Sequence, residues 1–112
     1  MKITESTIQI LRKAAEKSPS RYRIGGIAFS KRGNILGARS NTFRMDNIEP
    51  KRGAGGHCEQ RLMREFGRKV KTIIIMRIGK NGEIAPIDPC ETCSKIANKM
   101  GVKIITVSPE DV

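Results

Sequence analysis

The chain has 112 residues, which is enough for one apolar core but not for two. Its formal net charge of +11 attracts phosphates, on mononucleotides or on a polynucleotide, although a solvated basic surface without a ligand explains the same charge. No apolar run reaches the roughly 18 residues of a membrane span, and the polar start lacks the core of a signal peptide. Composition therefore predicts one soluble, cytoplasmic domain over residues 1–112 and argues against a membrane protein.

The first predicted element is an amphipathic helix over residues 4–17. Its apolar residues recur at helical spacing, and the sequence Ser18-Pro19-Ser20 then supplies a stop. A β-hairpin is expected next, because two short apolar segments, 23–30 and 34–38, flank a turn that contains Gly33.

Residues 40–56 show no sustained periodicity and contain one proline and three glycines, which predicts a long loop. Loops of this length in a compact domain are usually functional. A second helix is expected from His57 to Phe66, because apolar residues return at helical spacing and Gly67 ends the run.

The second half of the chain predicts a strand, a helix and a strand. Residues 72–78 are continuous and β-branched, as in a central strand covered on both faces. A helix is expected over 90–100, between Pro89 and Gly101, and a last strand over 102–107. Two strands joined through a helix should be parallel, so the order α-β-β-α-β-α-β predicts a four-stranded mixed sheet flanked by helices.

Three residues have the chemistry of zinc ligands. His57 begins the second helix, and Cys90 and Cys93 form a C-x-x-C that opens the third. Cysteines three apart share one helix face, and the helix N-terminus lowers a thiolate pKa. A catalytic zinc takes three protein ligands and leaves the fourth position to water, so the pattern predicts a catalytic zinc site.

Glu59 is not needed as a zinc ligand and is available as a general acid and base. Positions i and i+2 diverge by about 200° in a regular helix, so Glu59 reaches the same site as His57 only in an irregular first turn. From that position the carboxylate could take a proton from water and return it to a leaving amine.

The order His57-x-Glu59 followed by Pro89-Cys90-x-x-Cys93 resembles the zinc-dependent cytidine and deoxycytidylate deaminase superfamily. The likeness extends to the predicted hairpin, with 24–29 and 33–37 similar to the family's first hairpin, and to Asn41. It covers about residues 5 to 107.

The resemblance implies a three-layer α/β/α cytidine-deaminase-like fold with a mixed four- to five-stranded sheet. It implies that His57, Cys90 and Cys93 hold Zn²⁺, that Glu59 is the proton shuttle and that Asn41 contacts the sugar. Because its first zinc ligand would be His rather than Cys, the chain resembles the branches that act on deoxycytidylate and nucleic acids more than the branch that acts on free nucleosides. The chain departs from many relatives by ending soon after its fourth predicted strand, and the family likeness leads us to expect a homo-oligomer.

The substrate contacts are predicted from the long loop. Phe43 could stack on a pyrimidine or could be a local packing residue, and Asn41 could be only a turn residue. Arg44, Lys51 and Arg52 could meet a phosphate, or could belong to a solvated basic loop.

The first hypothesis is thus a hydrolase that deaminates a cytosine-type base on a free (deoxy)cytidine nucleotide such as dCMP. A second keeps the chemistry and moves it to cytosine or adenine in single-stranded DNA or RNA, although the chain has only four aromatic residues for stacking. A third is a non-catalytic, zinc-stabilised nucleic-acid-binding module. A structural zinc with Cys58 as fourth ligand leaves Glu59 unexplained, and Cys58 is expected in the core.

Overall fold

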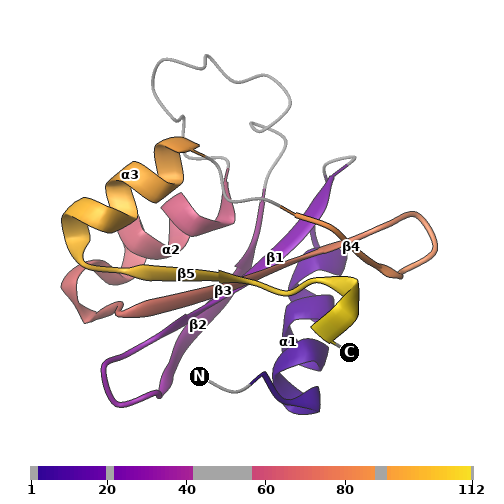
Figure 1. Cartoon of the computed structure of the whole chain (residues 1–112), viewed down its shortest axis with the longest axis horizontal. Coiled ribbons are helices and arrows are strands. Elements are labelled where there is room, and N and C mark those ends of the chain that lie inside the picture. Colours follow the sequence, from indigo (N-terminus) through magenta and orange to yellow (C-terminus); the bar gives the residue numbers. More distant parts are fainter. Residues whose placement is uncertain (1–2, 20–21, 42–56, 88–90, 112) are drawn as a thin grey trace.

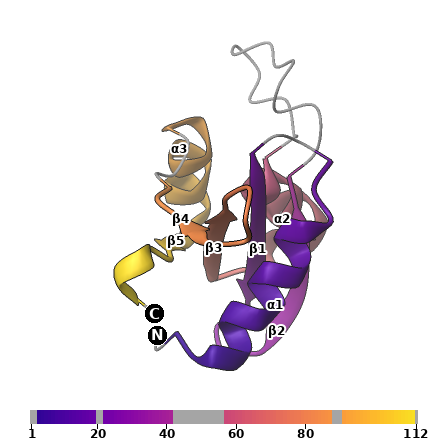
Figure 2. The same cartoon turned by 90° about the vertical axis from the view of Figure 1, so that its right-hand side faces the viewer.

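The computed structural model describes residues 3–19, 22–41, 57–87 and 91–111, in an α/β fold of three helices and one mixed sheet (Figures 1 and 2). The elements in chain order are α1 (Glu5–Glu16), β1 (Arg23–Phe29), β2 (Ile35–Ser40), α2 (Cys58–Phe66), the 3₁₀ turn η3 (Gly67–Lys69), β3 (Thr72–Ile78), β4 (Ile84–Ala85), α3 (Glu91–Met100), β5 (Lys103–Thr106) and the 3₁₀ turn η4 (Pro109–Asp111). No helix in these ranges is long and apolar enough to cross a membrane.

The sheet is ordered β2-β1-β3, and both β4 and β5 pair with the outer side of β3. β1 is antiparallel to β2 and to β3, whereas β5 is parallel to β3, as the crossover through α3 predicts. β5 pairs with Thr72–Ile75 and β4 with Arg77 and Ile78, so the two strands share one edge of β3. The five strands agree with the four to five that the family likeness implied. The order of predicted elements by itself gave only four, because β4 has only two residues and leaves no alternating pattern.

The strands β1 and β3 form the centre of the core. Ile73 and Ile75 face α2 and α3, whereas Ile74 and Met76 face α1, so β3 is buried on both sides. Figure 1 shows α2 and α3 on one side of the strands and α1 on the other. The three-layer α/β/α arrangement is therefore confirmed.

The helix α1 forms where its sequence predicts it. Thr4 caps its first turn by accepting a hydrogen bond from the backbone N–H of Thr7, and Leu11 and Ala15 are completely buried on the sheet. Gly25 in β1 allows this contact, because a Cβ there would meet the backbone of α1, including Ala15 N at 2.7 Å.

The helix α2 begins at the end of the sheet where β2 and β3 finish. In the register, Ser40 of β2 and Ile78 of β3 lie opposite Gly25 and Arg23 of β1, so β2 and β3 end side by side with β1 between them. Arg61, in the first half of α2, donates to the carbonyl of Ser40, and α3 leads to Lys103, which pairs with Thr72 at the opposite end of β3. This end of the sheet therefore holds the N-termini of the two helices that carry the predicted metal ligands.

Candidate active site

His57 is positioned by the first turn of α2. It is the N-cap residue, with extended backbone angles of φ −76° and ψ 138°, and Cys58 begins the helix. Because His57 lies outside the regular helix, the 200° divergence expected of positions i and i+2 does not separate it from Glu59. The irregular first turn that the sequence argument required is present.

His57, Glu59 and Cys93 form a compact cluster of possible metal ligands. One ligand atom from each, an imidazole nitrogen, a carboxylate oxygen and Cys93 Sγ, lie within 4.8 Å of one another. Glu59 lies in α2, His57 directly precedes that helix, and Cys93 lies in α3. An imidazole and a thiolate are typical zinc ligands, so this donor set fits zinc. Cys90 lies outside the described residues, and its part in the ligand set stays a prediction.

The Glu59 side chain is buried beside a thiol. Glu59 is 4 % exposed, and Cys58 Sγ donates a hydrogen bond to Glu59 Oε1 over 3.1 Å. Burial, followed by the charge of Glu59, raises the pKa of the Cys58 thiol well above its ordinary value. Cys58 therefore keeps its proton at neutral pH and stays a donor. Its burial in the core on this face of the sheet confirms the sequence expectation.

Gln60 is a site residue that the sequence argument missed. It is 6 % exposed, and its Nε2 donates to Cys93 Sγ over 3.5 Å. This contact gives the Cys93 sulfur a hydrogen-bond donor beside the ligand cluster and links α2 to α3. A glutamine in a helix carries no signal by itself, and only the packing of α3 against α2 shows its role.

Asn41 lies in the core where β2 ends. It is completely buried; its Oδ1 accepts from the backbone N–H of Ile24 at 2.9 Å, and its Nδ2 donates to the carbonyl of Tyr22. These bonds hold the start of β1 against the end of β2. The predicted sugar contact of Asn41 stays a prediction.

Tyr22 and Arg77 are a second feature that the sequence argument did not single out. The Arg77 guanidinium lies 4.7 Å from the Tyr22 ring centroid, and Tyr22 is 47 % exposed. Arg77 Nε is buried without a hydrogen-bond partner in the described parts of the chain. In the sequence, the one indication of this feature is that the charged residue Arg77 interrupts the apolar run of β3. Both residues lie at the end of the sheet where the site forms.

The remaining predicted substrate residues lie outside the described ranges. They are Phe43, Arg44, Lys51 and Arg52.

No protein-family model and no curated protein matches the sequence. Two solved structures are similar in fold. A cytidine deaminase from Burkholderia pseudomallei matches with a TM-score of 0.60 and 16 % identity, over 93 % of this chain and 86 % of that one. A variant of the cytidine deaminase from Mycobacterium tuberculosis matches with a TM-score of 0.56 and 17 % identity, over 91 % and 85 %. The chain therefore has the cytidine deaminase-like fold.

Proposed function

We propose that this protein is a zinc-dependent hydrolytic deaminase, which converts a cytosine-type base to a uracil-type base and releases ammonia. Its substrate would be a free (deoxy)cytidine nucleotide such as dCMP. One observation carries the proposal: His57, Glu59 and Cys93 place their ligand atoms within 4.8 Å of one another at the N-termini of two helices. The fold, shared with cytidine deaminases, supports it.

The ligand set follows from the donor atoms. His57 and Cys93 would hold zinc together with Cys90, which precedes α3 by one residue. Three such ligands leave the fourth tetrahedral position open and leave Glu59 outside the coordination shell. Zinc bound there would lower the pKa of a water molecule and make it a nucleophile near neutral pH.

Glu59 would carry the protons of the reaction. The net change adds water across the exocyclic C4–N bond of the ring: a C4–O bond forms, the C4–N bond breaks and the amine leaves as ammonia. The Glu59 carboxylate would accept a proton from the attacking water and deliver it to ring N3. It would then take the remaining proton from the new hydroxyl at C4 and pass it to the departing amine, so that C4 keeps a carbonyl oxygen. Its burial and its hydrogen bond from Cys58 hold it in one orientation for these transfers.

The substrate assignment rests on charge and on the scarcity of aromatic residues. A net charge of +11 suits an anionic substrate, while the sequence offers one tyrosine, three phenylalanines and no tryptophan for stacking on successive bases. We assign the sugar to Asn41, the base to Phe43 and the phosphate to Arg44, Lys51 or Arg52.

Deamination of a base in single-stranded DNA or RNA is the second candidate, favoured by the size of the net charge. The salt dependence of substrate affinity distinguishes a polynucleotide substrate from a free nucleotide. A polynucleotide held by six to ten phosphate contacts loses about 10³ to 10⁵-fold in affinity between 50 and 200 mM salt. A mononucleotide should show a far shallower dependence.

Ammonia release across a panel of cytosine nucleosides, mono- and triphosphates and oligonucleotides tests the proposal. We expect turnover of dCMP or a related free nucleotide, with a shallow salt dependence. Turnover confined to oligonucleotides would move the function to the second candidate, and a zinc-loaded protein without turnover of any panel member would contradict deamination.

A further inference from the structure

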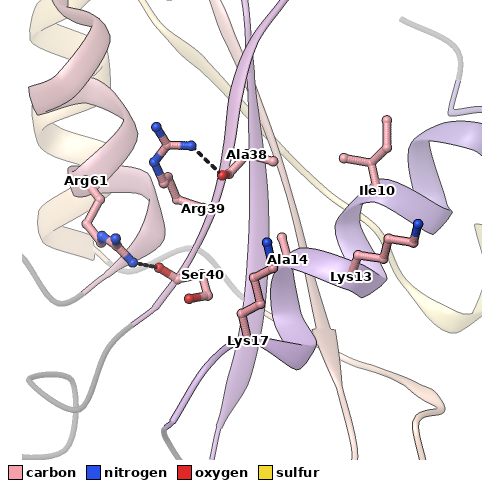
Figure 3. A pocket seen from close by; sticks show the side chains of 8 residues that line it. All are labelled: Ile10, Lys13, Ala14, Lys17, Ala38, Arg39, Ser40 and Arg61. Carbon is pink, nitrogen blue, oxygen red and sulfur yellow. Dashed lines mark hydrogen bonds between the residues drawn. The ribbon is translucent and has the colours of Figure 1, made fainter.

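A basic cleft of about 350 Å³ lies at the outer edge of β2 (Figure 3). Its walls come from α1 on one face of the sheet, from β2, and from α2 on the other face, and the lining residues are Ile10, Lys13, Ala14, Lys17, Ala38, Arg39, Ser40 and Arg61. Four of these eight residues are cationic, and none is acidic.

Two backbone carbonyls on the outer edge of β2 accept hydrogen bonds from arginine side chains in this cleft. Arg39 Nη1 donates to the carbonyl of Ala38 at 2.7 Å, and Arg61 donates to the carbonyl of Ser40. Unpaired backbone carbonyls at a sheet edge can pair with a strand of another chain. Here the carbonyls of Ala38 and Ser40 are bonded to arginine side chains instead. Because each guanidinium has five N–H donors, both arginines keep donors for a further ligand.

The charge of the cleft is largely uncompensated. Lys13 and Lys17 lie four residues apart, on the same side of α1, and neither forms an ion pair with another described residue. Arg39 is neutralised by Glu65 at 2.8 Å, which leaves Lys13, Lys17 and Arg61 without an acidic partner across the described ranges. Like charges held this close repel one another, and an anion between them would relieve the repulsion.

The cleft lies next to the candidate active site. The backbone N–H of Arg61 donates to the carbonyl of His57 at 3.1 Å, so Arg61 lies one helical turn, a rise of about 6 Å, after the metal-ligand cluster begins. On the strand side, Ser40 directly precedes the buried Asn41. A ligand that spans the cleft would thus extend toward the end of the sheet where the site forms.

We propose that this cleft binds the phosphate groups of a ligand that carries several of them. Three uncompensated cations exceed the charge of a single phosphate monoester, and arginine and lysine together suit phosphate oxygens. Two sources share this chemistry, the polyphosphate of a free nucleotide and the backbone of a single-stranded nucleic acid. The inference does not depend on deamination, because it concerns binding alone.

Binding of inorganic tripolyphosphate and of a short fluorescent oligothymidylate tests the proposal. The variants are K13A/K17A and, as a matched control, K95A/K99A, which removes two lysines at the same spacing from α3, outside the cleft. K13Q/K17Q provides a second version of the test, and circular dichroism verifies that each variant is folded.

We expect K13A/K17A to weaken binding of at least one of the two anions roughly tenfold or more, and K95A/K99A to change it less than about twofold. If the ligand is a nucleic acid, the slope of log K against log salt for the oligothymidylate should also fall by about 1.4, from two lost contacts to a single strand. If the ligand is a nucleotide polyphosphate, the loss of the two lysines should weaken binding of tripolyphosphate but not binding of the oligothymidylate. Equal weakening by both double variants, no weakening by K13A/K17A, or no binding of either anion by the wild type would overturn the proposal.

Discussion

The two faces of the central sheet are packed with different kinds of side chain. Between the sheet and α1 lies a cluster of buried apolar residues, with Leu11, Ile74 and Met76 completely buried. Between the sheet and α2, the helix buries Glu59 and Gln60 beside its apolar residues. Burying a charged carboxylate costs free energy, which the single hydrogen bond from the Cys58 thiol offsets only in part. The α2 face therefore loses stability by holding the candidate site, whereas the packing on the α1 face stabilises the fold.

Two adjacent glycines offer the largest expected test of this difference. A Cβ at Gly25 would collide with the backbone of α1, while one at Gly26 would lie 3.1 Å from both Cys58 Sγ and Leu62 Cδ1, which are side-chain atoms. We expect Gly25→Ala to destabilise the protein by more than about 4 kcal/mol, an exceptional value for one substitution. Gly26→Ala should cost about 1 to 3 kcal/mol as overpacking. Urea unfolding measures both, and equal losses would contradict the packing described.

A matched pair of leucines separates stability from activity. Leu11 on α1 and Leu62 on α2 are both completely buried. Each change to alanine should destabilise the protein by about 2 to 5 kcal/mol through lost burial and the cavity left behind. Only Leu62→Ala should also lower turnover per folded, zinc-loaded molecule, because Leu62 anchors the helix that presents His57 and Glu59. A comparable fall in turnover for Leu11→Ala would show that the site depends on both faces.

Cys58→Ala should have a smaller effect, confined to the α2 face. It removes the hydrogen bond to Glu59 and leaves a buried carboxylate oxygen unpaired, at a cost of about 1 to 3 kcal/mol. Turnover should fall together with stability, while Cys58→Ser, which keeps a donor, should retain most of both. Full turnover in the alanine variant would show that Glu59 does not need this bond.

The ion pair between Arg39 and Glu65, at the rim of the α2 face, should contribute least to the free energy of unfolding. Arg39 and Glu65 are 35 % and 45 % exposed, so Glu65→Gln should cost only about 0.2 to 1 kcal/mol, and less at high salt. Thermal unfolding at low and high salt gives the value. A loss of several kcal/mol would mean that the contact of Arg39 with Phe66, at 5.6 Å, also depends on the pair.

Much of the fold could be predicted from local pattern. The strand 72–78 agrees with β3 residue for residue, and the helices over 4–17 and 57–66 agree within one residue at each end with α1 and α2. These segments have strong periodicity and clear stops. The strand β4 was not predicted, because two residues are too few to show a periodic pattern.

The candidate site was predictable in part for a different reason. His57, Glu59 and Cys93 are recognised by chemistry and spacing, and the structure brings them together. The supporting contacts of Gln60 and the basic cleft depend on residues far apart in sequence, which no local pattern relates. The roles of Cys90 and of the loop residues rest on the sequence alone.

The most direct test of the account compares zinc content and ammonia release from dCMP in the wild type and in Glu59→Ala. We predict one zinc per chain in both proteins and a loss of turnover of about 10² to 10⁴-fold or more in the variant, because proton transfer by Glu59 disappears while the ligand set stays intact. Glu59→Ala with wild-type turnover, or a variant that loses its zinc, would contradict the role proposed for Glu59.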